Sequence, residues 1–245
     1  MVRITDLTKK YGDFVAVDGL SFAVGPGEVM GLVGPNGAGK TTTLRCLSGI
    51  IPPDAGAILI DGHDLREQPI AAKRRLAYFS DEPRLFDYLT VRQHLEFVAR
   101  IYAVPDAAEQ APRLLEELEI ADKADKLPAE LSRGMKQKLG IACGLLHRPA
   151  ALLFDEPLTG LDPRGIRQMK DTILRTARNG AGIVVSSHLL HLVEELCSHL
   201  LILARGRMVF HGTMAQVRER FAETAAGASL EDVFFRATDA TGDAG

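Results

Sequence analysis

Apolar and polar residues alternate along two segments near the start of the chain, Arg3–Leu7 and Val15–Val24, as they do in half-buried antiparallel strands. Gly25-Pro26-Gly27 follows and predicts a turn. Val29–Val33 is a short apolar run of the kind found in buried strands, and Thr41–Leu47 has the spacing of a helix. The first part of the chain therefore predicts an antiparallel β unit that leads into a buried strand and a helix.

Helical spacing dominates from about Val91 to His147, which predicts a helical lobe at about residues 85–147. The other segments alternate between strand and helix patterns. They comprise strands at Ala57–Ile60, Leu76–Ser80, Ala151–Phe154, Gly182–Ser186 and His199–Ala204, helices at Pro163–Asn179 and His188–Cys197, and a closing hairpin at Arg207–His211. Such alternation predicts an α/β fold with a mainly parallel sheet between helices. We expect the main domain to span residues 1–221. We expect residues 222–245 to form a short helix at Ser229–Ala237 and a loose tail.

Composition narrows the function classes. The 245 residues are 46% hydrophobic and 25% charged, which is ordinary for a globular protein. The net charge is -3, so the chain lacks the overall positive charge that is typical of proteins that bind nucleic acid. Cys46, Cys143 and Cys197 are far apart, so they predict neither a disulfide framework nor a zinc site. The sequence indicates no signal peptide and no membrane span, so work at a membrane requires a partner that supplies the membrane part.

The strongest local signal is the glycine-rich segment Gly34–Thr41, which reads Gly-Pro-Asn-Gly-Ala-Gly-Lys-Thr between a predicted strand and a predicted helix. It fits the pattern G-x-x-x-x-G-K-[ST]. Glycines let the backbone wrap around a phosphate with its N–H groups turned inward, and the helix that follows points its positive end at the anion. Lys40 offers a cation to the β- and γ-phosphates, and Thr41 offers a hydroxyl to Mg²⁺.

Two carboxylates, Asp155 and Glu156, end the buried strand Leu152–Phe154. Alone, this arrangement is common where a strand enters a turn. Beside a phosphate-binding loop, it places Asp155 to hold Mg²⁺ and leaves Glu156 to orient or deprotonate a water molecule.

A third signal is Leu131-Ser132-Arg133-Gly134-Met135, at the start of a predicted helix. Ser132 is a suitable N-cap, and Gly134 allows close approach of another backbone. Alone, this segment is an ordinary capped helix. The positive end of the helix also makes it a second anion site.

Together these three segments resemble the nucleotide-binding subunits of ABC transporters, over about residues 2–235. Gly34–Thr41 resembles the Walker A motif of the family, residues 152–156 resemble Walker B, and residues 131–135 resemble the signature usually written LSGGQ. Arg133 and Met135 depart from that wording at positions that vary in the family. The resemblance implies a P-loop NTPase core with a mixed, mainly parallel sheet, an N-terminal antiparallel β subdomain and a helical signature subdomain.

The resemblance also implies roles for individual residues. It implies a catalytic base at Glu156 and a γ-phosphate switch at His188. Mg²⁺ ligands are implied at Thr41 and Asp155. Asp81 stands where the family often has a metal-contacting Gln. Its side chain is shorter and charged, so whether it reaches the metal stays open. The alternative interpretation of this segment is an exposed turn. ATP contacts are implied at Tyr11, which would stack on adenine, and at Gly34, Asn36, Gly37, Ala38, Gly39, Lys40, Thr41, Thr42, Ser132, Gly134 and Asp162.

The resemblance further implies two subunits, facing head to tail, that close on ATP and drive an integral membrane permease from its cytoplasmic face. A complete motif set permits two working sites in a homodimer, which we expect, and a heterodimer is the alternative. The acidic pair Asp81-Glu82 and the sequence Ser229–Phe234 resemble exporter-type members. A soluble ABC-type ATPase acting on nucleic acid or the ribosome is the alternative, and a non-hydrolysing binding module is a further one. No coiled coil, second ATPase half or basic surface favours the nucleic-acid reading, and we expect no nucleic-acid partner.

Overall fold

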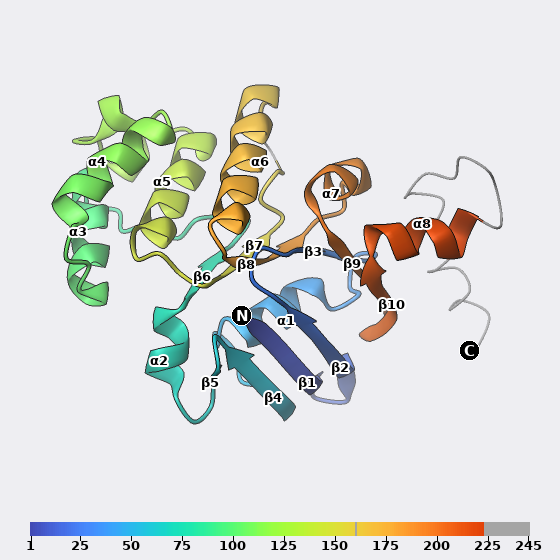
Figure 1. Ribbon diagram of the computed structural model, residues 1–245. Helices are drawn as coiled ribbons and strands as arrows, with labels where there is room; N and C mark the ends of the chain where they lie inside the picture. The colour runs from blue at the N-terminus through green and yellow to red at the C-terminus, as the bar shows by residue number, and fades with distance from the viewer. Residues whose placement is uncertain (160, 223–245) are drawn as a thin grey trace.

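Two β-sheets and the helices packed on them make up the part of the chain that the structure, a computed structural model, describes, which is residues 1–159 and 161–222 (Figure 1). The smaller sheet is antiparallel, with the order β2-β1-β4-β5. The larger sheet has the order β10-β9-β3-β8-β7-β6 and is parallel apart from the β9–β10 pair. The strands are β1 (Val2–Tyr11), β2 (Phe14–Val24), β3 (Val29–Val33), β4 (Ala55–Ile60), β5 (His63–Asp64), β6 (Leu76–Phe79), β7 (Ala151–Asp155), β8 (Gly182–Ser186), β9 (His199–Ala204) and β10 (Arg207–Thr213).

The helices divide between the lobe and the sheet. In Figure 1, α3, α4 and α5 lie together at one side of the molecule, beyond the edge strand β6, while α6 and α7 cover one face of the large sheet. The helices are α1 (Lys40–Leu47), α2 (Pro69–Arg74), α3 (Val91–Tyr102), α4 (Ala107–Glu117), η1 (Ala121–Lys123), η2 (Pro128–Glu130), α5 (Arg133–Leu146), α6 (Pro163–Arg178), α7 (Leu190–Leu196) and α8 (Met214–Ala222). No helix of the described ranges is both long enough and apolar enough to span a membrane.

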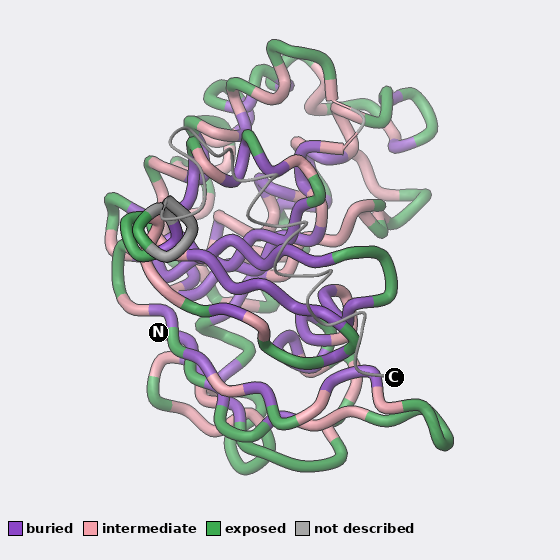
Figure 2. Tube along the Cα trace, turned by 90° about the vertical axis from the view of Figure 1, so that its right-hand side faces the viewer, coloured by how far each residue is buried: buried purple, intermediate pink, exposed green. Residues whose placement is uncertain are grey.

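The alternation of side chains along a strand builds a core on each face of the large sheet. In β7, Leu152 and Phe154 pack into the core that contains residues of α5, α6 and α7. Leu153, between them, packs into the second core with residues of α1 and the small sheet. Both faces of β7 are therefore apolar, which is why its sequence is a continuous hydrophobic run. Figure 2 shows these buried strands running through the middle of the molecule, with exposed segments around them.

The predicted α/β fold with an antiparallel β unit and a mainly parallel sheet is confirmed. The predicted start of the helix at His188–Cys197 was wrong. This boundary matters for the site because the prediction placed His188 inside the helix. Helix α7 instead begins at Leu190, since Leu189 is non-helical (φ -90°, ψ 83°) and donates its N–H to the Ser187 hydroxyl at 3.0 Å. His188 therefore lies in the loop between β8 and α7. The sequence prediction did not include the short helix α2 or helix α8.

Three caps fix where helices begin around the site. Ser132 accepts a hydrogen bond from the Met135 N–H, as expected of an N-cap, and Asp162 caps α6 in the same way. Thr90 forms a reciprocal capping box with Gln93 at the start of α3. The predictions for the C-terminal stretch, including Ser229–Ala237, the tail and the exporter-like sequence Ser229–Phe234, lie outside the described residues, and the predicted domain and lobe boundaries stay predictions.

Candidate active site

The glycine-rich loop joins the buried strand β3 to helix α1, as the sequence predicted. At two positions of the loop, the neighbouring backbone leaves room only for glycine. A Cβ on Gly34 would lie 2.4 Å from the Leu203 carbonyl oxygen, and a Cβ on Gly39 would lie 2.5 Å from that of Ala16. Gly39 also has a φ of +103°, which side chains rarely allow. Pro35, Asn36 and Gly37 between them are exposed, so the loop presents its backbone outward from a tightly packed base.

Lys40 is held inside this loop. Its ammonium group donates to the carbonyl oxygens of Gly34, at 2.7 Å, and Pro35, at 3.2 Å. Burial lowers the pKa of Lys40, while the negative charges of Glu156 and Asp155 act in the opposite direction. A buried cation bonded only to neutral carbonyl groups gains from a nearby anion, so this position favours a phosphate over the mouth of the loop.

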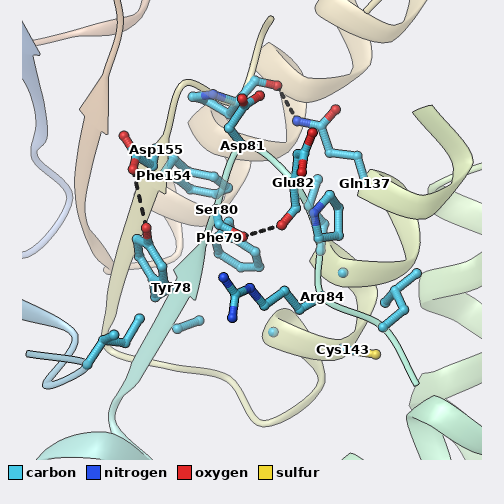
Figure 3. Close-up of a pocket in the computed structure, with 18 of the residues that line it drawn as sticks. Tyr78, Phe79, Ser80, Asp81, Glu82, Arg84, Gln137, Cys143, Phe154 and Asp155 are labelled. Atoms are coloured by element: carbon cyan, nitrogen blue, oxygen red, sulfur yellow. Dashed lines mark hydrogen bonds between the residues drawn. The ribbon is translucent and has the colours of Figure 1, made fainter. Parts of the chain in front are cut away.

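Asp155 is the centre of a hydrogen-bond network at the ends of three parallel strands. Its Oδ1 accepts from the Ser186 hydroxyl at 2.7 Å and from the Thr41 hydroxyl at 3.3 Å. Its Oδ2 accepts from the Tyr78 hydroxyl at 3.2 Å (Figure 3). Burial and the neighbouring Asp155 charge raise the pKa of Tyr78 to about 12, which keeps this hydroxyl a donor at neutral pH.

Glu156 stands next to Asp155 but is aimed differently. Its φ of +51° is unusual for a residue with a side chain and turns the chain out of the strand direction. The Glu156 N–H donates to the Ser186 hydroxyl at 3.0 Å, and its Oε2 lies 2.8 Å from His188 Nδ1. The Glu156 side chain is 20% exposed and that of His188 is 55% exposed. A partly solvated carboxylate beside an imidazole can receive a proton from water.

The remaining predicted residues lie at separate places on one chain. Ser132 is exposed and Gly134 half-buried at the start of α5, and Asp162 is exposed at the start of α6. A Cβ on Gly134 would meet only Leu161 Cδ2, at an ordinary 3.6 Å. Tyr11 ends β1 and is 48% exposed, and Lys9 Nζ lies 5.7 Å from the centroid of its ring. Thr42 is half-buried in the first turn of α1. Among the described residues, the Lys40 ammonium group bonds to Gly34 and Pro35, and the Ser132 hydroxyl bonds to the Met135 N–H.

Asp81 contacts the signature segment of its own chain. Its Oδ1 accepts a hydrogen bond from Arg133 Nη2 at 2.8 Å. Asp81 and Arg133 are both places where the sequence departs from the family wording. The expected contact of Asp81 with Mg²⁺ stays a prediction.

A groove of about 1060 Å³ lies between the edge of the large sheet and the helical lobe. Residues that follow β6 form one wall, and residues of α3 and α5 form the other. In Figure 3 the Arg84 side chain reaches into this space, and Phe79 stacks on Phe154 at its base with ring centroids 4.4 Å apart. Phe86 and Phe97, both partly exposed, also line it.

Sequence reasoning missed four residues that form hydrogen bonds in and around the site. They are Ser186, Tyr78, Arg133 and Gln137, whose Nε2 donates to the Pro157 carbonyl at 2.6 Å. Ser186 and Tyr78 carried a usable signal. Each lies at or near the carboxyl end of a strand in the predicted parallel sheet, and such ends meet at one edge. Arg133 and Gln137 carried none, because their partners depend on how α5 docks on the core.

Comparison with known proteins agrees with this site. Residues 17–159 match the family described as ABC transporter. The chain is 33% identical over 240 residues to the ABC-type transporter ATP-binding protein EcsA of Bacillus subtilis, covering 97% of this chain and 96% of that protein. It is 40% identical over 213 residues to the Nod factor export ATP-binding protein I of Burkholderia thailandensis, covering 86% and 70%.

Among solved structures, one described as an ATP binding subunit of an ABC transporter is similar with a TM-score of 0.91 and 34% identity. The match covers 97% of this chain and 99% of that chain. The names of these proteins do not favour the alternative of an ATPase that acts on nucleic acid.

Proposed function

The chain belongs to the ABC transporter family as an ATP-binding protein with the ATPase activity general to that family, and from this premise we propose that it is the Mg²⁺-dependent motor of an exporter. In this proposal two copies close on ATP and drive a separate integral membrane permease, to which the chain is attached at the cytoplasmic face. One observation carries the proposal: Lys40, Thr41, Asp155, Glu156 and His188 converge at the carboxyl ends of adjacent parallel strands.

The nucleotide is held by the loop between β3 and α1. Backbone N–H groups of residues 34–42 surround the phosphates, with contacts from Asn36, Ala38 and Thr42 among them. When ATP binds, the Lys40 ammonium group replaces hydrogen bonds to carbonyl oxygens of its loop with hydrogen bonds to phosphate oxygens. This exchange is favourable because a charge-assisted bond replaces a bond to a neutral group. Tyr11 stacks its exposed ring on adenine.

The chemistry of the donor set fits Mg²⁺. Thr41 Oγ1 and Asp155 Oδ1 are oxygen ligands 3.3 Å apart, and Mg²⁺ prefers oxygen donors from one or two protein groups together with substrate phosphates. When bound, Mg²⁺ neutralises charge that develops on the phosphate oxygens. Asp155 is oriented for this task by the Ser186 and Tyr78 hydroxyls, which donate to its two oxygens.

Hydrolysis uses Glu156 as the base. A water molecule in line with the γ-phosphorus loses its proton to an Oε of Glu156 as its oxygen forms the new P–O bond and the β–γ bridging bond breaks. His188 holds the carboxylate in place through its Nδ1 and presents its other ring nitrogen toward the γ-phosphate. The unusual backbone at Glu156 aims the base away from the metal-binding carboxylate, so that the two have different roles.

A second subunit completes the site. Ser132 and Gly134 act on nucleotide held by the other copy, and Asp162 shapes the site across the interface. The exposure of Ser132 and Asp162, and the open surroundings of Gly134, support action outside their own chain. The γ-phosphate then joins a glycine loop of one copy to a helix start of the other, and its loss opens the pair.

The test of this proposal is ATP hydrolysis by Glu156→Gln, which keeps the size of the side chain and removes the base. We expect kcat to fall by about 10²- to 10⁴-fold. Glu116→Gln, at an exposed glutamate on α4, is the matched control and should hydrolyse at the parent rate. Hydrolysis by Glu156→Gln at the parent rate would exclude Glu156 as the base.

The permease is proposed to dock in the groove beside the helical lobe, where residues 85–90 form an edge. Phe86 and Phe97 offer apolar contacts and Arg84 offers a charge there. Co-purification of Arg84→Glu with a co-expressed permease should fall severalfold, whereas Arg66→Glu, an exposed arginine outside the groove, should leave it intact. Equal recovery of both variants would refute docking at this place. Export as the direction rests on the names of relatives such as the Nod factor export protein.

A further inference from the structure

Asp81 and Arg133, two of the residues that depart from the family wording, are bonded to each other. Arg133 Nη2 donates to Asp81 Oδ1 at 2.8 Å, and the side chains are 50% and 48% exposed. Asp81 follows the core strand β6, and Arg133 is the first residue of α5. We propose that Asp81 is a positioning residue, which holds the start of α5 and thereby sets where Ser132 and Gly134 stand.

Helix α5 is fixed to the core unevenly along its length. Its later part is packed tightly, since a Cβ on Gly144 would lie 2.3 Å from the Phe79 ring. In the middle, Gly140 lies against Pro83, and the buried Gln137 bonds to a core carbonyl. At the start, the Asp81–Arg133 pair is the contact to the core that carries a charge. The part of α5 that bears the signature residues is therefore tied to the core through apolar packing of Leu131 and Met135 and through an exposed, salt-sensitive ion pair.

The contact with Arg133 gives Asp81 a role different from that of the metal-contacting Gln that the family often has at this position. Both oxygens of Asp155 already have partners among Thr41, Ser186 and Tyr78. The carboxylate of Asp81 is turned to α5 instead. A guanidinium group forms directional bonds to a carboxylate, so the pair fixes orientation as well as distance.

The functional consequence rests on the proposed two-copy site. Asp81 lies next to the strands that carry its own nucleotide site, whereas Ser132 and Gly134 serve the nucleotide on the second copy. The pair therefore connects the two sites through one chain. Its loss should lower kcat by misplacing the signature residues, while ATP affinity at the glycine loop stays near that of the parent, because Lys40 is held by carbonyl oxygens of its own loop.

The first experiment needs no nucleotide. Amide hydrogen exchange over residues 133–136 is compared among the parent, Asp81→Asn, Arg133→Gln and the double variant. The Met135 and Lys136 amides in this stretch bond to Ser132. We expect exchange there to rise about two- to fivefold in each single variant, the range expected for an exposed ion pair, with no further rise in the double variant. The swapped variant, Asp81→Arg with Arg133→Asp, should restore protection.

A matched control is the ion pair of Arg148 and Asp106, which join at 2.7 Å at another place. Arg148→Gln should leave exchange over 133–136 unchanged. Unchanged exchange in Asp81→Asn, or additive effects in the double variant, would overturn the proposal. The comparison of the two single variants with the double variant carries this test if the swapped variant does not fold.

The second experiment separates positioning from metal binding. ATP hydrolysis is titrated with Mg²⁺ in the same variants. Positioning predicts that Asp81→Asn and Arg133→Gln lower kcat alike, leave the Mg²⁺ midpoint unchanged and regain activity in the swapped variant. A raised Mg²⁺ midpoint in Asp81→Asn alone would make Asp81 a metal ligand and refute the positioning role. If the parent itself fails to hydrolyse ATP, the proposed function fails. Hydrogen exchange then still tests whether the Asp81–Arg133 pair holds the start of α5.

Discussion

Replacing Gly39 by alanine tests whether the glycine-rich loop is held in shape by close packing against the small sheet. Gly39 has a φ of +103°, and an added Cβ would lie 2.5 Å from the carbonyl oxygen of Ala16 in β2. Such a contact is with backbone, which cannot rotate away as a flexible side chain can. The matched variant is Gly37→Ala, because Gly37 also has a positive φ, of +79°, but a Cβ there would have no neighbour within 4 Å.

Both substitutions strain the backbone, but only Gly39→Ala also introduces a steric clash. Both impose backbone strain of about 1–3 kcal/mol, less about 0.4–1 kcal/mol recovered because alanine restricts the unfolded chain. Gly39→Ala adds an overpacking cost of about 1–3 kcal/mol. The free energy of unfolding should therefore be lower for Gly39→Ala than for Gly37→Ala by about 1–3 kcal/mol.

Urea unfolding without nucleotide measures this difference as a shift of midpoint at an unchanged slope. Working without nucleotide removes any contribution from lost phosphate contacts, so the measurement concerns packing alone. Equal midpoints for the two variants would refute the claim that contact with Ala16 shapes the loop.

Three further substitutions test individual groups of the site. Lys40→Ala should weaken ATP binding by about 10- to 100-fold in titration calorimetry, since it removes charged hydrogen bonds worth about 1.5–3 kcal/mol; binding within twofold of the parent would contradict the phosphate contact. His188→Ala leaves Glu156 without its imidazole partner and should lower kcat by about 10²-fold or more in a phosphate-release assay, with retained activity counting against the switch. Tyr78→Phe should remove a loss of stability between about pH 10 and 12, because the folded chain holds the Tyr78 proton to a pKa of about 12 while the unfolded chain releases it near 10. An unaltered alkaline unfolding profile would show that Tyr78 is not buried beside Asp155.

The residues that sequence could predict are those whose neighbours are local or repeat with the period of a strand. Val29–Val33 and Ala151–Phe154 are continuous apolar runs because cores lie on both sides of the sheet. Ser132 was predicted as a cap because its partner, the Met135 amide, is three residues away. The roles of Lys40, Asp155 and Glu156 rest on motif resemblance and stay predictions.

What sequence could not predict depends on long-range packing. Asp81 and Arg133 are 52 residues apart, and their contact follows from the docking of α5 on the edge of the sheet. The backbone turn at Glu156 had no local signal either, since glutamate rarely adopts a positive φ unless its surroundings impose it. The different directions of the Asp155 and Glu156 side chains therefore follow from this turn and from the Ser186 hydroxyl that accepts a hydrogen bond from the Glu156 N–H.

The central claim, that ATP joins two copies and hydrolysis parts them, is tested most directly by the mass of Glu156→Gln in solution. Sedimentation or light scattering is recorded with and without Mg²⁺ and ATP. We expect a monomer without nucleotide and a persistent dimer with ATP, because the γ-phosphate bridge forms and is not cleaved. A variant that binds ATP fully and remains monomeric would contradict it.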